Sequence, residues 1–232
     1  MTTTTQVPHG RSLDAGRCAR LSGAAFAILF STGSALWALG DWPSAGAPTA
    51  EIVDFYRDTS DRIVIGASLS LLALAAFLVF AAAVRQMITE AGGGELLATV
   101  AFAGAVLGSA AGLGAETINM VGALRAGDGE LSDALAQATH EISQILGSTA
   151  TGLGIGVFAL ATAASALRTG LILPRWLAVV TAIVGAALLT PVSRVPEVSG
   201  GSMVLITAMF ALLLLRARVE DQEPVATGAG RT

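Results

Sequence analysis

The chain has 232 residues, of which 53% are hydrophobic and only 13% are charged, against about 25% charged residues in an average soluble domain. So few charges cannot cover the surface of a soluble fold of this size, and the composition therefore predicts an integral membrane protein. The formal net charge of -4 excludes a basic surface for nucleic acid. Cys18 is the single cysteine, which excludes an intramolecular disulfide and a thiolate metal cluster; no cofactor is expected.

Six apolar runs follow one another along the chain. They cover residues 21–40, 63–84, 96–124, 135–167, 176–192 and 201–215. A bilayer core about 30 Å thick needs roughly 20 apolar residues in a helix, so the third and fourth runs should tilt or project beyond it. The last two runs are short, and Pro191 ends the fifth. The sequence predicts an all-α bundle of six transmembrane helices; in the alternative, the last two runs form a partly buried hairpin and four spans remain.

The loop between the first two runs, residues 41–62, carries the pattern of a short amphipathic helix. Pro48 and Thr49 suit its first turn. One face would hold Ile52, Phe55 and Tyr56, and the opposite face Asp54, Asp58 and Asp61. The acidic face argues against adsorption to anionic lipid, so we expect this helix to cap the mouth of the bundle.

Arginine supplies all 13 basic residues, and its distribution predicts the orientation. With the N-terminus in the cytoplasm, nine arginines fall on the cytoplasmic side and four outside, as the positive-inside rule requires. We therefore expect both termini to be cytoplasmic, in a bacterial inner membrane. Residues 1–18 and 218–232 are polar and are expected to be disordered tails around a transmembrane domain of residues 19–217.

The third run carries a row of small residues. Gly104, Gly108 and Gly112 recur every fourth residue, and Glu116 continues the same row. Such a row lets another helix approach closely. Glu116 should therefore face protein rather than lipid, where an ionised carboxylate costs several kcal/mol. Asn119, three residues further on, shares that face.

The fourth run carries His140, Glu141 and Gln144 near its start. If the turn between the runs centres near Gly129, Glu116 and Glu141 lie at the same depth, because they stand 13 and 12 residues from it. The sequence thus predicts an outward-facing polar pocket between the third and fourth helices, with Asp41, Asp61 and Arg62 at its mouth. Its ligand-binding residues would be Glu116, Asn119, His140, Glu141 and Gln144. No metal is expected, since His140 is the only histidine in the apolar part and no HExxH spacing occurs.

Several functions fit this pattern. The leading hypothesis is binding of a lipid-like or small organic molecule in the pocket. An intramembrane enzyme is an alternative in which two close carboxyl groups share one proton and one acts as general acid; its catalytic candidates would be Glu116, Glu141 and His140. A proton-coupled transporter and an interaction subunit, docked through small residues to a partner or a second copy, are the others. In the simplest interpretation Glu116 only fixes helix register, and His140 and Glu141 are interfacial.

Residues 167–178, Leu-Arg-Thr-Gly-Leu-Ile-Leu-Pro-Arg-Trp-Leu-Ala, precede a run rich in glycine and alanine. This stretch, with Arg20-Leu21-Ser22-Gly23 before the first run, resembles a bacterial membrane family classed as domain of unknown function 4386. The resemblance is loose over most of the chain and specific over about a dozen residues of it. It implies a polytopic helical architecture and no established activity, so no residue role follows from it.

Overall fold

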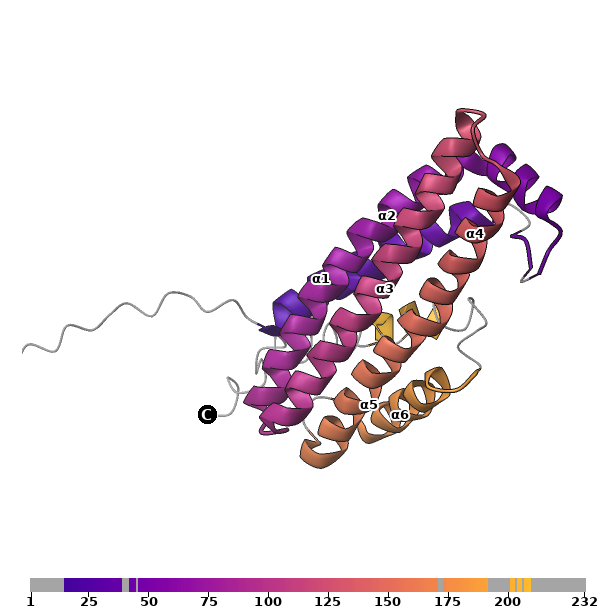
Figure 1. Ribbon diagram of the computed structural model, residues 1–232. Coiled ribbons are helices and arrows are strands. Elements are labelled where there is room, and N and C mark those ends of the chain that lie inside the picture. Colours follow the sequence, from indigo (N-terminus) through magenta and orange to yellow (C-terminus); the bar gives the residue numbers. More distant parts are fainter. Residues whose placement is uncertain are drawn as a thin grey trace, which may run out of the picture.

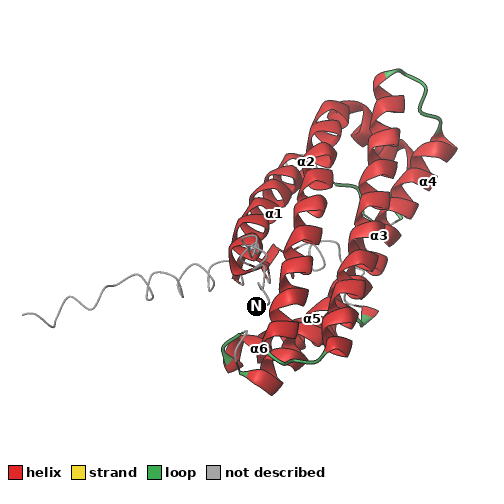
Figure 2. Ribbon diagram, turned by 90° about the vertical axis from the view of Figure 1, so that its left-hand side faces the viewer, coloured by secondary structure: helices red, strands yellow, loops and turns green. Residues whose placement is uncertain are grey.

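The computed structural model of the chain describes residues 15–38, 42–44, 46–170, 173–191, 201–202, 204–205 and 207–209. These residues form helices and no strand, which confirms the all-α class (Figure 2). The elements are α1 (Ala15–Ala38), α2 (Thr49–Glu90), α3 (Glu95–Gly127), α4 (Asp133–Gln144), a π-helix η1 (Ile145–Ala150), α5 (Thr151–Thr169) and α6 (Arg175–Leu188). Residues 15–18, expected in the first tail, are the start of α1. The rest of both expected tails lies outside the described residues.

Four helices in the described part of the chain are long and apolar enough to cross a membrane. They are α1, α2, α3 and the continuous helix that runs from α4 through η1 into α5 (Figure 1). The fifth expected span corresponds to α6, whose 14 residues reach only about 21 Å. Of the sixth, residues 201–215, only positions 201–202, 204–205 and 207–209 are described, and these are helical.

The expected surface helix of the first loop is not a separate element, because it forms the first part of α2. No glycine or proline stands between Thr49 and Ile65 to end it. As the spacing predicts, Ile52 and Tyr56 are buried and Asp54 is exposed. With 42 residues, α2 is about 63 Å long, roughly twice the thickness of a bilayer core.

The interior consists of two apolar clusters. The larger is centred on α1, α2, α3 and α5, where Phe77 contacts Phe26 and Phe158 at ring-centroid distances of 5.2 Å and 5.5 Å. The smaller joins the first turns of α2 to the end of α3 and the start of α4 around Ile52 and Tyr56. In Figure 1 these segments meet at one end of the bundle, here called the α3–α4 end. This end therefore has an apolar core of its own.

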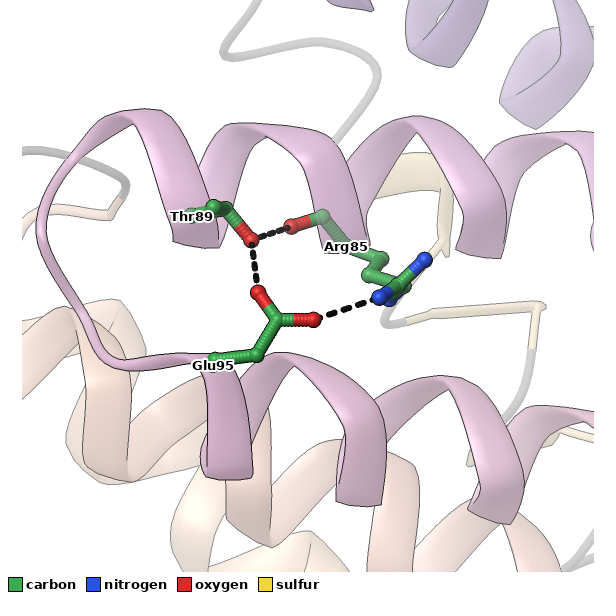
Figure 3. Close-up of polar contacts among 3 residues, drawn as sticks. All are labelled: Arg85, Thr89 and Glu95. Atoms are coloured by element: carbon green, nitrogen blue, oxygen red, sulfur yellow. Dashed lines mark hydrogen bonds and ion pairs between the residues drawn. The ribbon is translucent and has the colours of Figure 1, made fainter.

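A polar cluster fastens α2 to α3 at the opposite end of the bundle (Figure 3). The Arg85 guanidinium pairs with one carboxylate oxygen of Glu95, and the Thr89 hydroxyl lies 3.3 Å from the other. The turn between them uses Gly92 and Gly94, whose φ angles of 72° and 96° suit glycine. The three side chains are exposed, so the cluster contributes at most about 1 kcal/mol. Its role is to fix the register of α2 against α3.

Candidate functional site

The glycine row of α3 packs directly against the backbone of α5. A Cβ atom added at Gly154 would lie 2.2 Å from the backbone nitrogen of Gly108, and one added at Gly104 would lie 2.7 Å from that of Phe158. This confirms that the row faces protein, as small residues at this spacing predict. On α5, Gly152 and Gly156 form a second pair of small residues four positions apart. In the structure Gly154 makes the contact, and Gly156 instead faces α6, where an added Cβ would lie 2.9 Å from the Gly185 carbonyl oxygen.

Glu116 lies one turn beyond this row and is 9% exposed, which confirms that it faces protein. Its Oε2 atom is fully buried and has no hydrogen-bond partner among the described residues. The Ser70 side chain of α2 faces the same carboxyl group. Beside it is a cavity of about 40 Å³ lined by Phe30, Leu74, Gly112, Ala115, Glu116, Gly147 and Thr151. These residues come from α1, α2, α3 and the η1–α5 segment, so the cavity lies between four segments of the bundle.

The π-helix η1 forms one wall of this cavity through Gly147. Its wider turn changes which side chains reach the carbonyl groups: the Thr151 hydroxyl donates to the Leu146 oxygen, five residues back, at 2.9 Å. The Ser148 hydroxyl donates to the Gln144 oxygen, four residues back, as in an ordinary α-helix. Because the Thr151 proton is used inside its own helix, only acceptor capacity remains for the cavity. Short π-helices within α-helices often mark functional sites.

Asn119 is held by a tyrosine from α2. The Tyr56 hydroxyl donates a 2.9 Å hydrogen bond to Asn119 Oδ1, and both residues are buried. The Ser143 side chain of α4 faces the same phenol oxygen. Gly122 makes room for this contact, since an added Cβ would lie 3.0 Å from the Tyr56 ring and 2.8 Å from the Thr139 methyl. The spacing in the sequence places Tyr56 on an apolar helix face. Its hydroxyl group, the one polar atom of the side chain, was the only feature that could have indicated a hydrogen bond to a buried residue such as Asn119.

His140 is 1% exposed and lies under the segment that follows α1. Its ring lies against Trp42, with centroids 5.4 Å apart, and Trp42 in turn contacts Phe55 edge-on. Neither ring nitrogen makes a hydrogen bond of normal geometry to a described residue, although the Ser44 backbone faces the ring. The Ser143 hydroxyl donates to the His140 carbonyl oxygen at 2.9 Å. His140 is therefore a buried base close to the surface of the α3–α4 end.

The expected pairing of Glu116 with Glu141 does not form. Glu141 is exposed and accepts a 3.0 Å hydrogen bond from Gln137 on its own helix. The residue level with Glu116 is Gly147, whose added Cβ would lie 3.4 Å from Ala115. It stands six residues, or about 9 Å, beyond Glu141. Two causes add up: α4 begins only at Asp133, and η1 inserts an extra residue into its helix.

The remaining predicted residues lie apart from the cavity. Gln144 is half-buried, and its carbonyl oxygen accepts the Ser148 hydroxyl. Asp61 and Arg62 are exposed on α2, and Asp41 lies outside the described residues. The structure thus brings Glu116 together with Ser70 and Thr151. It places Asn119 and His140 along the path from Glu116 to the α3–α4 end.

The part of the chain that the structure describes contains no group of three or more His, Cys, Asp or Glu side chains placed to hold a metal ion. Glu116 is the one titratable side chain among the described residues that line the cavity. No protein family, curated protein or solved structure matches the chain. The function must therefore be inferred from the chemistry of this site.

Proposed function

We propose that the protein is a multi-pass membrane protein that binds the amino or ammonium head of a small lipid-like or organic molecule at Glu116. The observation that carries this proposal is the buried Oε2 atom, which has no partner among the described residues and lies beside a cavity. An intramembrane carboxyl group is costly to keep, so it is a functional-site hypothesis by default. A ligand that donates hydrogen bonds would supply the missing partner.

The polar residues of the cavity lining favour a ligand that donates hydrogen bonds over one that accepts them. Glu116 offers carboxyl oxygens, and the Thr151 hydroxyl has only its lone pairs left. No arginine is among the described lining residues, so an anionic head group would meet no opposite charge. A neutral amine that enters the cavity would take the proton of the Glu116 carboxyl group, and the two would form an ammonium–carboxylate ion pair without a proton leaving the site.

The volume of the cavity and its apolar lining residues indicate which other groups of the ligand it could hold. About 40 Å³ corresponds to roughly three water-sized groups, which is enough for an ammonium group and the first carbon atoms of a chain. Phe30 offers a ring face that attracts a cation, and Leu74 offers contact to methylene groups. The longer apolar remainder of a lipid-like molecule would lie outside this cavity.

The membrane arrangement that we propose has six spans, with α6 and residues 201–215 as the two short ones. Both termini would lie in the cytoplasm of a bacterium and the α3–α4 end outside, as the arginine distribution indicates. The Glu116 cavity would then be in the outer half of the bilayer. Membership of the family classed as domain of unknown function 4386 is part of the same proposal and rests on residues 167–178.

The test compares an amine with an alcohol of equal chain length. Purified protein in detergent is heated with hexylamine or with 1-hexanol, and the melting temperature is measured for wild type, Glu116→Gln and Glu141→Gln. We expect hexylamine to raise the melting temperature of wild type and of Glu141→Gln, because bound ligand stabilises the folded state. Glu116→Gln should show only the small change that 1-hexanol produces. An equal shift by hexylamine in Glu116→Gln would contradict the proposal.

A proton-coupled transporter is the second candidate, and one observation favours it. Buried polar side chains continue from Glu116 toward the α3–α4 end, through Asn119, Tyr56 and Ser143. An enzyme that uses paired carboxylates is not favoured, since Glu141 points away from Glu116 and no second carboxylate lines the cavity among the described residues.

A further inference from the structure

The Glu116 cavity lies near the middle of the membrane. Its lining residues Phe30, Leu74, Gly112 and Thr151 each stand within two residues of the midpoint of one of the first four apolar runs. A run that crosses a bilayer core of about 30 Å has its midpoint about 15 Å from water on either side. Glu116 follows Gly112 by one turn. At this depth the outer surface of the bundle contacts hydrocarbon, whichever end of the bundle faces the cytoplasm.

Both directions along the bundle axis are closed by apolar side chains. Toward the α3–α4 end lies the smaller apolar cluster, in which Ile52 and Tyr56 are fully buried. In the other direction lies the larger cluster, which contains the buried rings of Phe77 and Phe158. Close-packed interiors leave few spaces larger than a water molecule. A ligand that moved along the axis to Glu116 would therefore have to displace one of these clusters.

The remaining direction is sideways, between α1 and η1. Helix α1 packs on α2, α2 on α3, and α3 on η1 and α5, which closes the other sides of the cavity. Between α1 and η1 the described residues show no comparable packing. Five of the seven lining residues are buried, and the two half-buried ones are Phe30 of α1 and Gly147 of η1. The cavity therefore approaches the surface between Phe30 and Gly147, here called the lateral opening.

Small residues border the lateral opening. Gly147 has no side chain, and a Cβ atom added there would meet only Ala115, at 3.4 Å. On α1, Ala27 and Ser34 stand about one turn from Phe30 on its more exposed side. Among the described lining residues, Phe30 is thus the one large side chain at the lateral opening.

We propose that the ligand enters from the hydrocarbon of the membrane through the lateral opening. The inference rests on the proposed function and adds the class of its ligand: a membrane-dissolved amine with an apolar chain. The amino head would lie at Glu116, and the chain would pass between Phe30 and Gly147 into the lipid. Each methylene group favours the membrane over water by about fourfold, so such a chain concentrates the ligand at the depth of the cavity.

Entry from lipid agrees with the charge of the site. An ammonium ion is costly in hydrocarbon, whereas a neutral amine crosses it without a charge. In the cavity the O–H bond of the Glu116 carboxyl group breaks and an N–H bond forms on the lone pair of the amine. Among the described lining residues no other titratable group competes for this proton. No ion therefore has to pass the lateral opening.

The experiment measures from which phase the Glu116 carboxyl group can be reached. Protein in lipid vesicles is treated with lipid-soluble diisopropylcarbodiimide or with a cationic, water-soluble carbodiimide present on both sides of the membrane. Each reagent takes the carboxyl proton on one nitrogen while the carboxyl oxygen bonds to its central carbon, and the adduct rearranges to a stable N-acylurea that mass spectrometry detects. We expect the lipid-soluble reagent to modify Glu116, and the water-soluble one to modify exposed groups such as Glu141 but not Glu116. Modification of Glu116 by the water-soluble reagent at the rate of Glu141, or none by diisopropylcarbodiimide, would overturn the proposal.

Gly147→Leu tests the lateral opening itself. Its Cβ has room beside Ala115, so the rest of the side chain would occupy the opening. We expect it to slow the modification of Glu116 by diisopropylcarbodiimide about tenfold, or about 1.4 kcal/mol in the barrier, because the reagent must displace that side chain. Gly114→Leu is the matched control: an added Cβ there also has its nearest neighbour at 3.4 Å, in Leu146, but Gly114 does not line the cavity. It should react at the wild-type rate, and equal slowing by both variants would overturn the proposal.

Phe30→Ala changes the lateral opening in the opposite direction. It removes the ring and should speed the reaction of Glu116 with diisopropylcarbodiimide severalfold, while the reaction of Glu141 with the water-soluble reagent stays unchanged. If the melting temperature shows that Gly147→Leu does not fold, Phe30→Ala decides. A wild-type rate in Phe30→Ala and in folded Gly147→Leu would overturn the proposal.

The direction of entry and the ligand can fail separately. Stabilisation by hexylamine that depends on Glu116, with no effect of Gly147→Leu on the carbodiimide reaction, would refute only entry through the lateral opening. The expected carbodiimide pattern without such stabilisation would refute only the ligand. Dodecylamine added to the vesicles should protect Glu116 from diisopropylcarbodiimide. Lack of this protection in a protein that hexylamine stabilises would contradict the placement of the chain in the lateral opening.

Discussion

The Tyr56 hydroxyl reaches Asn119 across 63 residues of sequence and bonds to its Oδ1 atom at 2.9 Å. The bond joins the apolar cluster of the α3–α4 end to the face of α3 that carries Glu116, since Tyr56 belongs to that cluster and Asn119 to that face. This hydrogen bond therefore connects the first part of α2 to the helix face of the candidate site.

Removing either partner of this bond should destabilise the protein. Tyr56→Phe leaves a buried acceptor on Asn119, and Asn119→Leu leaves a buried hydroxyl, each costing about 1–3 kcal/mol. The double variant should cost less than the sum of the two, because it leaves neither group unpaired. Denaturation in detergent of all four proteins measures the coupling. Additive losses would mean that the two groups do not interact.

Gly154→Ala should weaken the packing of α3 on α5. The new Cβ would lie 2.2 Å from the Gly108 nitrogen and 2.5 Å from its Cα, and backbone atoms cannot move aside as a side chain can. We expect a loss of about 1–3 kcal/mol, the usual cost of overpacking. Gly114→Ala is the control: its Cβ would meet only the end of Leu146, at 3.4 Å, and alanine favours helix. Equal stability of the two variants would argue against the close contact.

Glu116 should carry its proton at neutral pH when no ligand is bound. Its carboxyl group is buried and no cationic side chain lines the cavity among the described residues. Wild type should therefore show a carboxylic-acid infrared band at pH 7, which Glu116→Gln removes and Glu141→Gln retains, since Glu141 is exposed. If the band is absent from wild type, Glu116 is not the buried acid that the site requires.

Glu116→Met should leave the stability unchanged or raise it by about 1 kcal/mol, although it removes the site. Replacing a buried polar group that has no partner by an apolar one of similar shape is often neutral or stabilising. The midpoint of urea or thermal unfolding in detergent measures this effect. Asn119→Leu is the contrasting variant, which should lose stability because Asn119 accepts a hydrogen bond from Tyr56. A loss above about 2 kcal/mol would indicate a structural bond to Glu116.

The proposed orientation can be tested on one helix. Ala50 and Glu90 stand near the two ends of α2 and are both exposed. In a Cys18→Ser background, a membrane-impermeant thiol reagent added to intact cells should modify Ala50→Cys and spare Glu90→Cys. The reverse pattern would place the α3–α4 end on the cytoplasmic side.

The features that depend on composition and helical spacing could be predicted from the sequence. The all-α class, the burial of Glu116 and the contact of the α3 glycine row with protein all follow from a period of 3.6 residues and from the cost of charge in lipid. The single long helix α2 was harder to predict. Its continuity from Thr49 to Glu90 depends on the absence of a helix-breaking residue, and no residue pattern marks such continuity directly.

The composition of the site was less predictable. Matching Glu116 with Glu141 assumed a symmetric turn and a regular helix, and η1 breaks the second assumption without a sequence signature that propensities would reveal. Tyr56 lies on an apolar face, so its hydroxyl became significant only when α2 was seen to pass Asn119. The contact of Gly154 with α3 could not be predicted, because three glycines alternate in α5 and spacing alone cannot say which of them faces α3.

The π-helix means that the segment from α4 to α5 holds one residue more than an α-helix of the same register needs. An insertion usually rotates everything after it by about 100° around the helix axis; here the widened turn absorbs it, so both flanks keep their faces. The chain can therefore lose a residue at this place and nowhere else in that helix without turning Gly154 away from Gly108. Deleting the exposed Thr149 would give a shorter protein of unchanged packing whose wall beside Glu116 is an ordinary α-helix.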